Sequence, residues 1–516
     1  GQLMADRFYV TTPIYYVNDV PHIGHAYTTV ACDALARYQR AAGREVFFLT
    51  GTDEHGQKVE KSAAERGERS IDLADRVVTR FQHLWEVLDI SLSRFVRTTE
   101  PAHREAVEEL FRRVKANGDI YLGAYEDWYC TPCETFWTES QLMEGNCPDC
   151  NRPTEKLKEA SYFFRMSKYQ DALLAHIEAH PEFIQPVSRR NEILSFVREG
   201  LRDLSISRTT FSWGIPVPDD PEHVLYVWFD ALTNYLTGVG FPGDPETYER
   251  FWPCDVHVIG KDILRFHAVY WPTFLLSAGV PLPKTVFAHG WWTVEGKKMS
   301  KSLGNVVDPE AMAEAYGVDA FRYFVLREVP FGLDGDFSRD ALVHRINSDL
   351  ANDLGNLVSR VLAMLGKYRD GVVPRVSSFG HERADEELRE KLAAVRGEVA
   401  QAMGELAFHK ALTAVWSFIG LVNKYVDTTA PWTLAKEPEQ AGRLDQVLYN
   451  MCEALRCVGL LVFPFLPGTG TEIWRRLGME RPAAEGLLEE LAHWGGITPG
   501  LQTERGESLF PRIEAS

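Results

Sequence analysis

Lysine and serine side chains crowd one short loop between two glycines. Residues Lys297 to Ser302 read Lys-Lys-Met-Ser-Lys-Ser, and Gly296 and Gly304 flank them. Three ammonium groups beside two hydroxyls suit the negative charge that develops when a nucleotide triphosphate is cleaved. Taken alone, the stretch fits an ordinary solvated loop equally well.

Two histidines near the N-terminus form the second candidate group. The segment 13–21 leads into His22-Ile-Gly-His25. Two histidines three residues apart are more often a metal pair or a chance occurrence. Gly24 between them favours catalysis, because it lets the backbone approach a ligand and lets both imidazoles donate hydrogen bonds to phosphate oxygens.

Four of the eight cysteines form a cluster with metal-ligand spacing. Cys130-Thr-Pro-Cys133 and Cys147-Pro-Asp-Cys150 are separated by thirteen residues, which predicts two knuckles of one tetrahedral zinc site per chain. Four thiolates leave no open coordination position, so the zinc is expected to be structural. The remaining cysteines are scattered singly and are expected to be reduced thiols: Cys32, Cys254, Cys452 and Cys457.

The elements predicted around the histidines form a βαβ unit. Residues 7–12 have the composition of a buried strand that Pro13 ends, a helical pattern runs from Gly24 to a cap at Gly43, and residues 45–49 read as a second strand. The histidines then stand at a helix N-terminus, beside exposed N–H donors, at the carboxyl edge of a parallel sheet. Open α/β sheets bind nucleotides at that edge.

A second half of the chain repeats this order. Residues 255–259 read as a strand that runs into Gly260-Lys-Asp, and residues 285–290 give a further strand before the lysine loop. The string Thr50 to Gly56 follows the strand 45–49 at the same edge, where one carboxylate could hold the ammonium group of an amino acid. A capped turn is the alternative for Glu54. The pattern predicts a doubly wound sheet.

Composition limits the possible partners. The formal net charge of -18 argues against indiscriminate nucleic-acid binding, although it does not exclude an RNA that is read by shape and unstacked bases. No apolar run approaches the roughly 20 residues that span a bilayer, and no signal segment is recognised. We therefore expect a cytoplasmic protein that binds neither membrane nor DNA.

Beyond residue 308 the pattern is helical. Apolar residues between 346 and 365 form one stripe, and Asn352, Asn356 and Arg360 repeat every four residues on another face. Such side chains can contact base edges and phosphates, and Trp432 after Pro431 can stack on an unpaired base. A solvated polar face and a core tryptophan are the alternatives.

On these motifs the chain resembles the methionyl-tRNA synthetases, which are class I aminoacyl-tRNA synthetases, from Phe8 to about residue 470. Class I membership rests on the two stretches His22-Ile-Gly-His25 and Lys298-Met-Ser-Lys-Ser302. The choice of methionine rests on four further stretches: Pro13-Ile-Tyr-Tyr16, Gly51-Thr-Asp-Glu-His-Gly56, Tyr226-Val-Trp-Phe-Asp-Ala231 and Gly260-Lys-Asp-Ile263.

The resemblance implies an enzyme that activates L-methionine with ATP and Mg²⁺ to methionyl-adenylate and transfers the methionyl group to the 3' end of tRNA(Met), for initiation and elongation. It implies catalysis by His22, His25, Lys298 and Lys301, with Gly24, Ser300 and Ser302 completing the ATP site. We expect a monomer, because no appended dimerisation domain is recognised after the helical part.

The resemblance also implies the substrate-recognition residues. Asp53 would take the ammonium group, and Arg208 would return near the site from the end of the zinc segment. The methionine side chain would be enclosed by Ile14, Tyr16, Trp228, Ala231, Leu232, Tyr235, Ile263 and His267, although the family commonly has proline where Leu232 stands. Aromatic walls suit a thioether, and Tyr16 and His267 offer it hydrogen bonds. The anticodon would be read by Asn352, Asn356, Arg360 and Trp432.

The expected fold is α/β: a doubly wound parallel nucleotide-binding sheet interrupted by a zinc-stapled insertion, followed by an α-helical bundle. The expected units are the first catalytic half, the zinc insertion, the second catalytic half, the lysine loop with a linking region that contacts the tRNA stem, and the anticodon-binding bundle. Their bounds are 4–116, 117–215, 216–295, 296–345 and 346–516.

Three alternatives share some of these features. A relative that charges leucine, isoleucine or valine would normally carry a far larger hydrolytic insertion, and one that charges cysteine would place zinc in its substrate pocket. A small-molecule nucleotidyltransferase would leave some 170 helical residues without a purpose. A non-enzymatic RNA-binding protein would not need phosphate motifs in both halves of one sheet.

Overall fold

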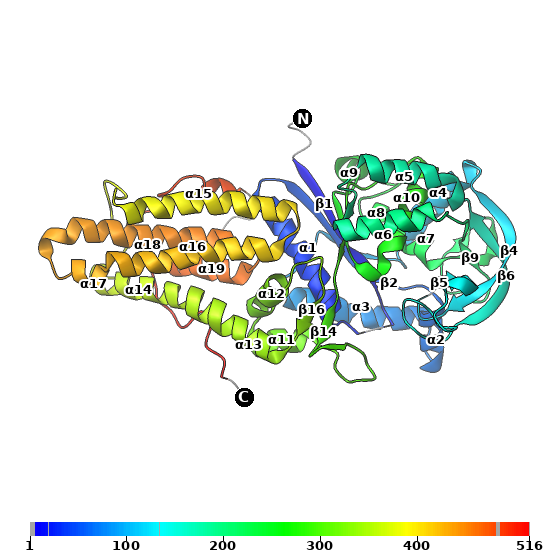
Figure 1. Ribbon diagram of the computed structural model, residues 1–516, viewed down its shortest axis with the longest axis horizontal. Helices are drawn as coiled ribbons and strands as arrows, with labels where there is room; N and C mark the ends of the chain where they lie inside the picture. The colour runs from blue at the N-terminus through cyan, green and yellow to red at the C-terminus, as the bar shows by residue number, and fades with distance from the viewer. Residues whose placement is uncertain (1–5, 19, 134, 481–485, 515–516) are drawn as a thin grey trace.

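A six-stranded parallel sheet lies at the centre of the molecule (Figure 1). The computed structural model describes residues 6–18, 20–133, 135–480 and 486–514. Both halves of the chain build the sheet, because β1 of the first half pairs with β12 of the second. The strand order is β3 (Arg94–Arg97), β2 (Glu45–Asp53), β1 (Arg7–Tyr16), β12 (Val256–Gly260), β13 (Val286–His289) and β7 (Ile184–Gln185).

Both faces of this sheet are buried, as a doubly wound fold requires. Neighbouring residues on a strand enter different cores: Val10 and Phe48 join one, whereas Tyr9 and Leu49 join the other. The helices of the two catalytic halves are α1 (Ile23–Ala41), α2 (Gln57–Glu65), α3 (Ser70–Val87), α4 (Pro101–Ala116), α7 (Val227–Leu232), α8 (Asn234–Thr237), α9 (Pro245–Phe251), η4 (Lys261–Ile263), the π-helix η5 (Phe266–Tyr270) and α10 (Trp271–Ala278).

Strand β1 differs from the prediction, because Pro13 does not end it. The strand continues to Tyr16, and its pairing with β2 shifts register between Thr11 and Ile14. Its pairs with β12 are Val10 and Thr11 only. Proline is tolerated there because an irregular position needs no ladder donor. The extension carries Ile14 and Tyr16 beyond the sheet's regular edge.

The insertion that carries the four clustered cysteines is built on an antiparallel sheet at the right of Figure 1. Its order is β5 (Thr135–Trp137), β4 (Ile120–Cys130), β6 (Glu155–Phe164) and β8 (Leu204–Ser205). Strand β7 also comes from this segment, so the insertion is joined to the edge of the main sheet. The other elements are η2 (Glu139–Gln141), η3 (Met166–Tyr169), α5 (Gln170–Ala179), α6 (Val187–Arg198), β9 (Ser207–Arg208), β10 (Pro216–Val217) and β11 (Asp220–Leu225).

The lysine loop grows out of a small three-stranded sheet, in which β14 (Trp292–Val294) lies between β15 (Lys297–Lys298) and β16 (Gly335–Phe337). Three helices connect it to the bundle: α11 (Pro309–Tyr316), α12 (Val318–Arg327) and α13 (Arg339–Arg345).

The helical bundle fills the left half of Figure 1. The predicted helix 346–365 begins as the π-helix η6 (Ile346–Gly355), which runs into α14 (Asn356–Arg369). A break between α18 and α19 falls at Phe463 to Leu466. The remaining helices are α15 (Arg383–Gly404), α16 (Phe408–Thr429), α17 (Pro431–Leu434), η7 (Pro438–Gln440), α18 (Ala441–Val462), α19 (Pro467–Arg476) and α20 (Leu487–Glu490).

Among the described residues, no helix has the length and apolarity needed to cross a bilayer. Residues 4–5 of the first expected unit, and residues 481–485 and 515–516 of the last, lie outside the described residues.

Candidate functional site

The two histidines of the first signature cap helix α1. Nδ1 of His22 accepts a hydrogen bond from the Gly24 N–H, and Nδ1 of His25 accepts one from the His22 N–H, both at 3.0 Å. A neutral imidazole whose Nδ1 accepts must carry its proton on Nε2. The cap therefore presents both rings as Nε2–H donors, which suits hydrogen bonding to phosphate oxygens.

Glycine is required at position 24 because the ring of His22 folds over it. A Cβ there would lie 2.8 Å from Cε1 of His22, which is closer than atoms pack. This packing is a second reason for glycine beside the predicted one, in which Gly24 lets the backbone approach a ligand, and that role stays a prediction. The expectation of exposed N–H donors also changes, since the Gly24 N–H is taken by His22 and the Ile23 N–H by Val307.

His25 is held as a neutral donor by its surroundings. Its ring meets the edges of Tyr15 at 4.8 Å and Phe81 at 5.4 Å, centroid to centroid. Burial, together with the neighbouring ring of His22, lowers the pKa of His25 well below its usual value. At neutral pH the ring can give a hydrogen bond without adding a charge.

The lysine loop joins this site through its backbone. The N–H of Ile23, at the first turn of α1, donates to the carbonyl of Val307 at 3.1 Å. Lys298 and Lys301 are exposed, and the loop is shaped by Asn305, whose Oδ1 accepts from the Ser300 N–H at 2.8 Å. The segment that directly follows the lysine signature thus lies at the N-terminus of α1, more than 270 residues away from it in the sequence.

The predicted methionine-binding residues gather around one apolar core. Tyr235 and Leu232 belong to the core beneath the sheet's edge, while Ala231 and His267 are also buried. Four others are half-buried and pack against that core: Ile14, Tyr16, Trp228 and Ile263. Half-buried apolar side chains around a buried floor are the composition of a small-ligand pocket.

The hydrogen bonds of His267 contradict one expectation. Its Nδ1 donates to the Ile263 carbonyl at 3.0 Å, so Nε2 is the acceptor for the Tyr235 hydroxyl at 2.6 Å. Burial lowers the pKa of His267 to about 4, which keeps the ring neutral. Both ring nitrogens are used, so in this arrangement His267 orients Tyr235 and has no hydrogen bond left for a thioether.

The sequence-based prediction missed Phe266. Its ring stacks on Trp228 with centroids 3.8 Å apart and planes 9° apart. The signal was available, because Phe266 adjoins His267 and stands three residues after Ile263. The stacked pair forms a continuous aromatic wall.

Glu54 and Asp53 follow β2 but have different surroundings. Arg97 binds both carboxylate oxygens of Glu54 at 2.7 and 2.8 Å, and Thr52 donates to the same group. Glu54 is therefore a structural anion, although it does not cap the next helix as the alternative expected, since the N-cap of α2 is Gly56 with no side-chain cap. Asp53, at the end of β2 opposite Tyr16, remains the carboxylate assigned to the ammonium group.

A buried carboxylate ties this loop to the helix that carries Trp228, one of the predicted methionine-binding residues. Asp230 on α7 pairs with Nδ1 of His55 at 2.6 Å and Nε2 of His103 at 2.7 Å. Burial alone would raise its pKa, but the two histidines lower the pKa of Asp230 to about 2. Asp230 thereby fixes the loop after Asp53 against the helix that carries Trp228. His55 and His103 lie 175 and 127 residues from Asp230 in the sequence. No local sequence pattern could therefore predict these contacts.

The four predicted cysteine ligands converge. Sγ of Cys130 lies 3.5 Å from Sγ of Cys150, and Sγ of Cys133 lies 3.8 Å from Sγ of Cys147. These distances exclude disulfides, whose sulfurs are about 2.05 Å apart. Four thiolates around one tetrahedral ion with metal–sulfur bonds of about 2.3 Å would be about 3.8 Å apart. The cluster can hold a metal ion.

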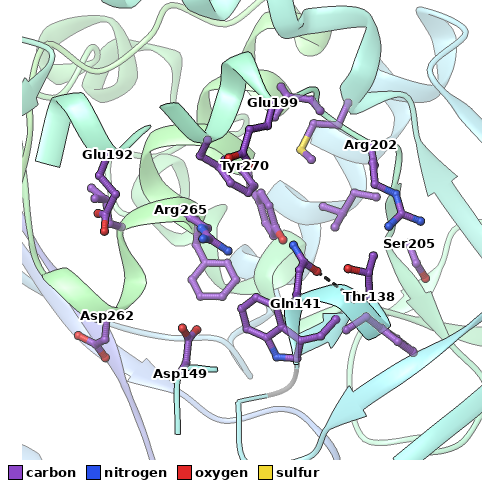
Figure 2. A pocket seen from close by; sticks show the side chains of 18 of the residues that line it. Thr138, Gln141, Asp149, Glu192, Glu199, Arg202, Ser205, Asp262, Arg265 and Tyr270 are labelled. Carbon is purple, nitrogen blue, oxygen red and sulfur yellow. Dashed lines mark hydrogen bonds between the residues drawn. The ribbon is translucent and has the colours of Figure 1, made fainter. Parts of the chain in front are cut away.

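Arg208 returns from the zinc segment toward the catalytic half, where it is buried. Its guanidinium lies 4.5 Å from the ring centroid of Tyr226 and 4.3 Å from that of Phe136. It lines a cavity at the junction of the insertion and the second catalytic half (Figure 2). Nε of Arg208 lies 3.6 Å from Glu159.

The predicted anticodon residues lie on the bundle. Asn352 and Asn356 are exposed, and Oδ1 of Asn352 accepts from Arg512 of the C-terminal segment at 3.1 Å. Arg360 pairs with Asp427 of α16 at 2.7 Å. Trp432 is 41% exposed, which rules out the core alternative. Its helix α17 lies at the far left of Figure 1, at the opposite end from β4 and β6.

Family comparisons agree with this geometry. Residues 8–160 and 151–362 match the family described as tRNA synthetases class I (M). Residues 373–516 match the anticodon binding domain of methionyl tRNA ligase. The chain belongs to the methionyl-tRNA synthetase family. The catalytic part and the bundle both match models of the methionine family. This excludes the alternative that the chain is a relative specific for leucine, isoleucine, valine or cysteine.

Individual relatives show the same likeness over nearly the whole chain. The methionine–tRNA ligase of Caldanaerobacter subterraneus subsp. tengcongensis is 52% identical over 99% of this chain and 80% of its own. That of Thermotoga maritima is 48% identical over 99% and 81%. The Mycobacterium tuberculosis methionyl-tRNA synthetase in complex with methionyl-adenylate has a TM-score of 0.94 at 48% identity, covering 98% of this chain and 100% of that one. Its apo form has a TM-score of 0.88 at 44% identity, covering 99% of each chain.

The Asp230 clamp gives a first prediction. Asp230→Ala leaves two buried imidazole N–H groups without an acceptor, at about 1–3 kcal/mol each, so the thermal midpoint should fall. Loosening of the loop after Asp53 should raise KM for methionine more than it lowers kcat in pyrophosphate exchange. The matched control is Glu45→Ala, which breaks an exposed ion pair on the same strand β2 and should change neither quantity. An unaltered KM in a destabilised Asp230→Ala protein would contradict the clamp.

Proposed function

We propose that the chain activates L-methionine with ATP and charges tRNA(Met), and that the residues gathered at the sheet's edge do this chemistry. One observation carries the assignment of residues: the hydrogen bond from Ile23 to Val307 brings the end of the lysine loop to the helix N-terminus where the two Nε2–H donors stand. Family membership supplies the substrate and product.

The first step is nucleotidyl transfer. A carboxylate oxygen of methionine bonds to the α-phosphorus of ATP, the bond from that phosphorus to the bridging oxygen breaks, and pyrophosphate leaves with the electron pair. We assign His22 and His25 to hydrogen bonding with the phosphate oxygens, and Lys298 and Lys301 to the negative charge on the departing pyrophosphate. Mg²⁺ accompanies the nucleotide. Gly24, Ser300 and Ser302 complete the proposed ATP site.

The methionine side chain is assigned to the half-buried apolar ring, and its ammonium group to Asp53. Tyr235 is held by His267, so the floor of the pocket is preorganised. In the second step the terminal ribose hydroxyl oxygen bonds to the methionyl carbonyl carbon. The bond from that carbon to the adenylate oxygen breaks, AMP leaves with the electron pair, and the hydroxyl proton passes to a phosphate oxygen of AMP.

We assign zinc to the four cysteines, because thiolate-only tetrahedral sites select it and all four positions are filled. We assign anticodon reading to Asn352, Asn356, Arg360 and Trp432. We also propose that the fold divides into five units at the bounds given in the sequence analysis. Action in the cytoplasm as a monomer that binds no DNA stays a prediction.

The test of the function is pyrophosphate exchange with each of the twenty amino acids in turn. Methionine alone should support rapid exchange without tRNA, and charging of tRNA(Met) should follow. Exchange that prefers another amino acid, or that needs no amino acid, would overturn the assignment. The second result would favour a small-molecule nucleotidyltransferase.

Removal of one phosphate donor gives a second prediction. His25→Ala should lower the exchange kcat by about 100- to 1,000-fold, the effect of losing one preorganised donor, and Lys301→Ala should act similarly. His180→Ala and Lys156→Ala, both at exposed positions of the insertion, are the matched controls. Because His25 also caps α1, the thermal midpoint is measured on each preparation. Exchange at the parent rate in either variant would remove that residue from the site.

The cysteine cluster gives a third prediction. Elemental analysis of freshly purified, unchelated protein should find one zinc per chain, and Cys147→Ser should lose it because a hydroxyl is a poor zinc ligand. Cys254→Ala, which removes a buried thiol outside the cluster, should retain the metal. Absence of zinc from the parent, or equal zinc in both variants, would refute the assignment.

The position of Trp432 gives a fourth prediction. Trp432→Ala should lower kcat/KM for charging by about 5- to 150-fold, since one lost base stack costs about 1–3 kcal/mol. Exchange and the thermal midpoint should stay near the parent values, because the side chain is exposed and distant from the sheet. Trp432→Phe should recover part of the loss, and Thr433→Ala serves as the exposed neighbouring control. Charging at the parent rate would exclude stacking by Trp432.

A further inference from the structure

A second buried histidine lies against the pair formed by Tyr235 and His267. His257 of β12 is completely buried, and its ring centroid lies 4.2 Å from that of Tyr235, with the two planes 37° apart. None of the roles assigned above uses His257. A buried imidazole is stable only when its ring nitrogens have hydrogen-bond partners, and those partners show which parts of the site this ring connects.

The hydrogen bonds of His257 fix its tautomer. Nε1 of Trp271 lies 3.2 Å from Nε2 of His257, and an indole N–H can only donate. Nε2 is therefore the acceptor, so the proton of the neutral ring lies on Nδ1, which donates to the hydroxyl of Thr11 at 2.7 Å. Burial, together with the nearby ring of His267, lowers the pKa of His257 well below its usual value. The ring thus stays neutral and keeps both hydrogen bonds.

His257 stands where the regular pairing of β1 ends. Thr11 and His257 are the last paired residues of the parallel ladder between β1 and β12. The pairing of β1 with β2 shifts register between Thr11 and Ile14. The side-chain hydrogen bond from His257 to Thr11 therefore holds β1 at the point where its backbone ladder with β12 stops. The extension of β1 that carries Ile14 and Tyr16 begins from this point.

This imidazole thereby contacts three elements that carry, or adjoin, the predicted methionine-binding residues. Its Nδ1–H is bound to β1, and its face contacts Tyr235 of α8. Its Nε2 is bound to Trp271, the first residue of α10, which directly follows the π-helix η5 that carries His267. The ring of Trp271 also meets that of Tyr235, with centroids 5.9 Å apart. One buried side chain that binds several walls of a site sets the distances between them.

We propose that His257 is a positioning residue that sets the selectivity for methionine, because it fixes the plane of the Tyr235 ring and the point from which β1 leaves the regular sheet. It does not touch the substrate. The proposal rests on the assignment of Ile14, Tyr16 and Tyr235 to the methionine side chain, given above. It adds the group that keeps these walls at a fixed separation, so that a longer side chain cannot push them apart.

Two substitutions can break the two ties of His257 one at a time. The amide of asparagine reaches the position of Nδ1, so His257→Asn should keep the bond to Thr11 and leave the Nε1–H of Trp271 without an acceptor. The amide of glutamine reaches the position of Nε2, so His257→Gln should keep the bond to Trp271 and lose the one to Thr11.

The test is pyrophosphate exchange with methionine and with ethionine, whose side chain is longer by one methylene. In the parent, kcat/KM for methionine should exceed that for ethionine by about 10- to 200-fold, the effect of one methylene in a fixed pocket. Both His257 variants should lower this ratio. They should also raise KM for methionine by about 5- to 150-fold, since a buried polar group loses its partner. KM for ATP should stay near the parent value.

A milder substitution tests the same tie if the His257 variants do not fold. Thr11→Val keeps the shape of the side chain but cannot accept from Nδ1 of His257, so it should lower the methionine-to-ethionine ratio, whereas Thr11→Ser retains the hydroxyl and should keep the ratio. The matched control is His223→Gln, which takes another buried histidine from its bond to Ser207 at 3.0 Å. It should lower the thermal midpoint without changing the ratio.

The parent ratio in the Thr11→Val protein would overturn the proposal. An equal fall of the ratio in His223→Gln would also overturn it, as would a KM for ATP that rises as much as KM for methionine, because both results would indicate a general loss of structure. In each case methionine-dependent exchange by the parent would leave the charging function standing. Failure of the parent to exchange pyrophosphate with methionine would instead overturn the proposed function.

Discussion

The N-terminus of helix α1 is the constraint on which the catalytic arrangement depends. A helix leaves its first N–H groups without intrahelical partners, and here two of them are satisfied by groups that matter for chemistry. Gly24 donates to the ring of His22, and Ile23 donates to the carbonyl of Val307 at the end of the lysine loop. Capping therefore fixes the tautomers of both histidines and anchors the loop. Because the N–H groups of Ile23 and Gly24 are used for this, the proposed binding of phosphate relies on the side chains of the site.

The site proposed for methionine depends on a comparable tie between the two halves of the sheet. Asp230 belongs to the second half, and it binds His55 and His103 of the first. Because all three side chains are buried, breaking one bond would leave polar groups without water or a partner. The loop after Asp53 and the helix that carries Trp228 are thus held at a fixed separation. A pocket that must distinguish a thioether from similar side chains needs such fixed walls.

Local patterns in the sequence predicted the parts of this structure whose causes are local. The βαβ unit and the cysteine cluster follow from spacing and composition, and both are present. The continuation of β1 past Pro13 was missed, because whether proline ends a strand depends on where its neighbours stop pairing. The Asp230 tie and the engaged nitrogens of His267 depend on partners brought together by folding. Single-residue patterns carry no information on such pairs.

The catalytic sheet and the bundle are joined by buried charge. Arg322 of α12 pairs with Asp33 of α1 at 2.7 Å and donates to the carbonyl of Phe465, at the turn before α19. Burial alone would raise the pKa of Asp33, but Arg322 and Arg37 lower it. Asp33 is also paired with Arg37 at 2.9 Å, so removing Asp33 would leave the buried guanidinium of Arg322 without its carboxylate, which is strongly destabilising. This buried contact ties α1 of the catalytic sheet, α12 of the linking region and the turn before α19 of the bundle together, so the placement of the bundle depends on burial of charge as well as on apolar packing.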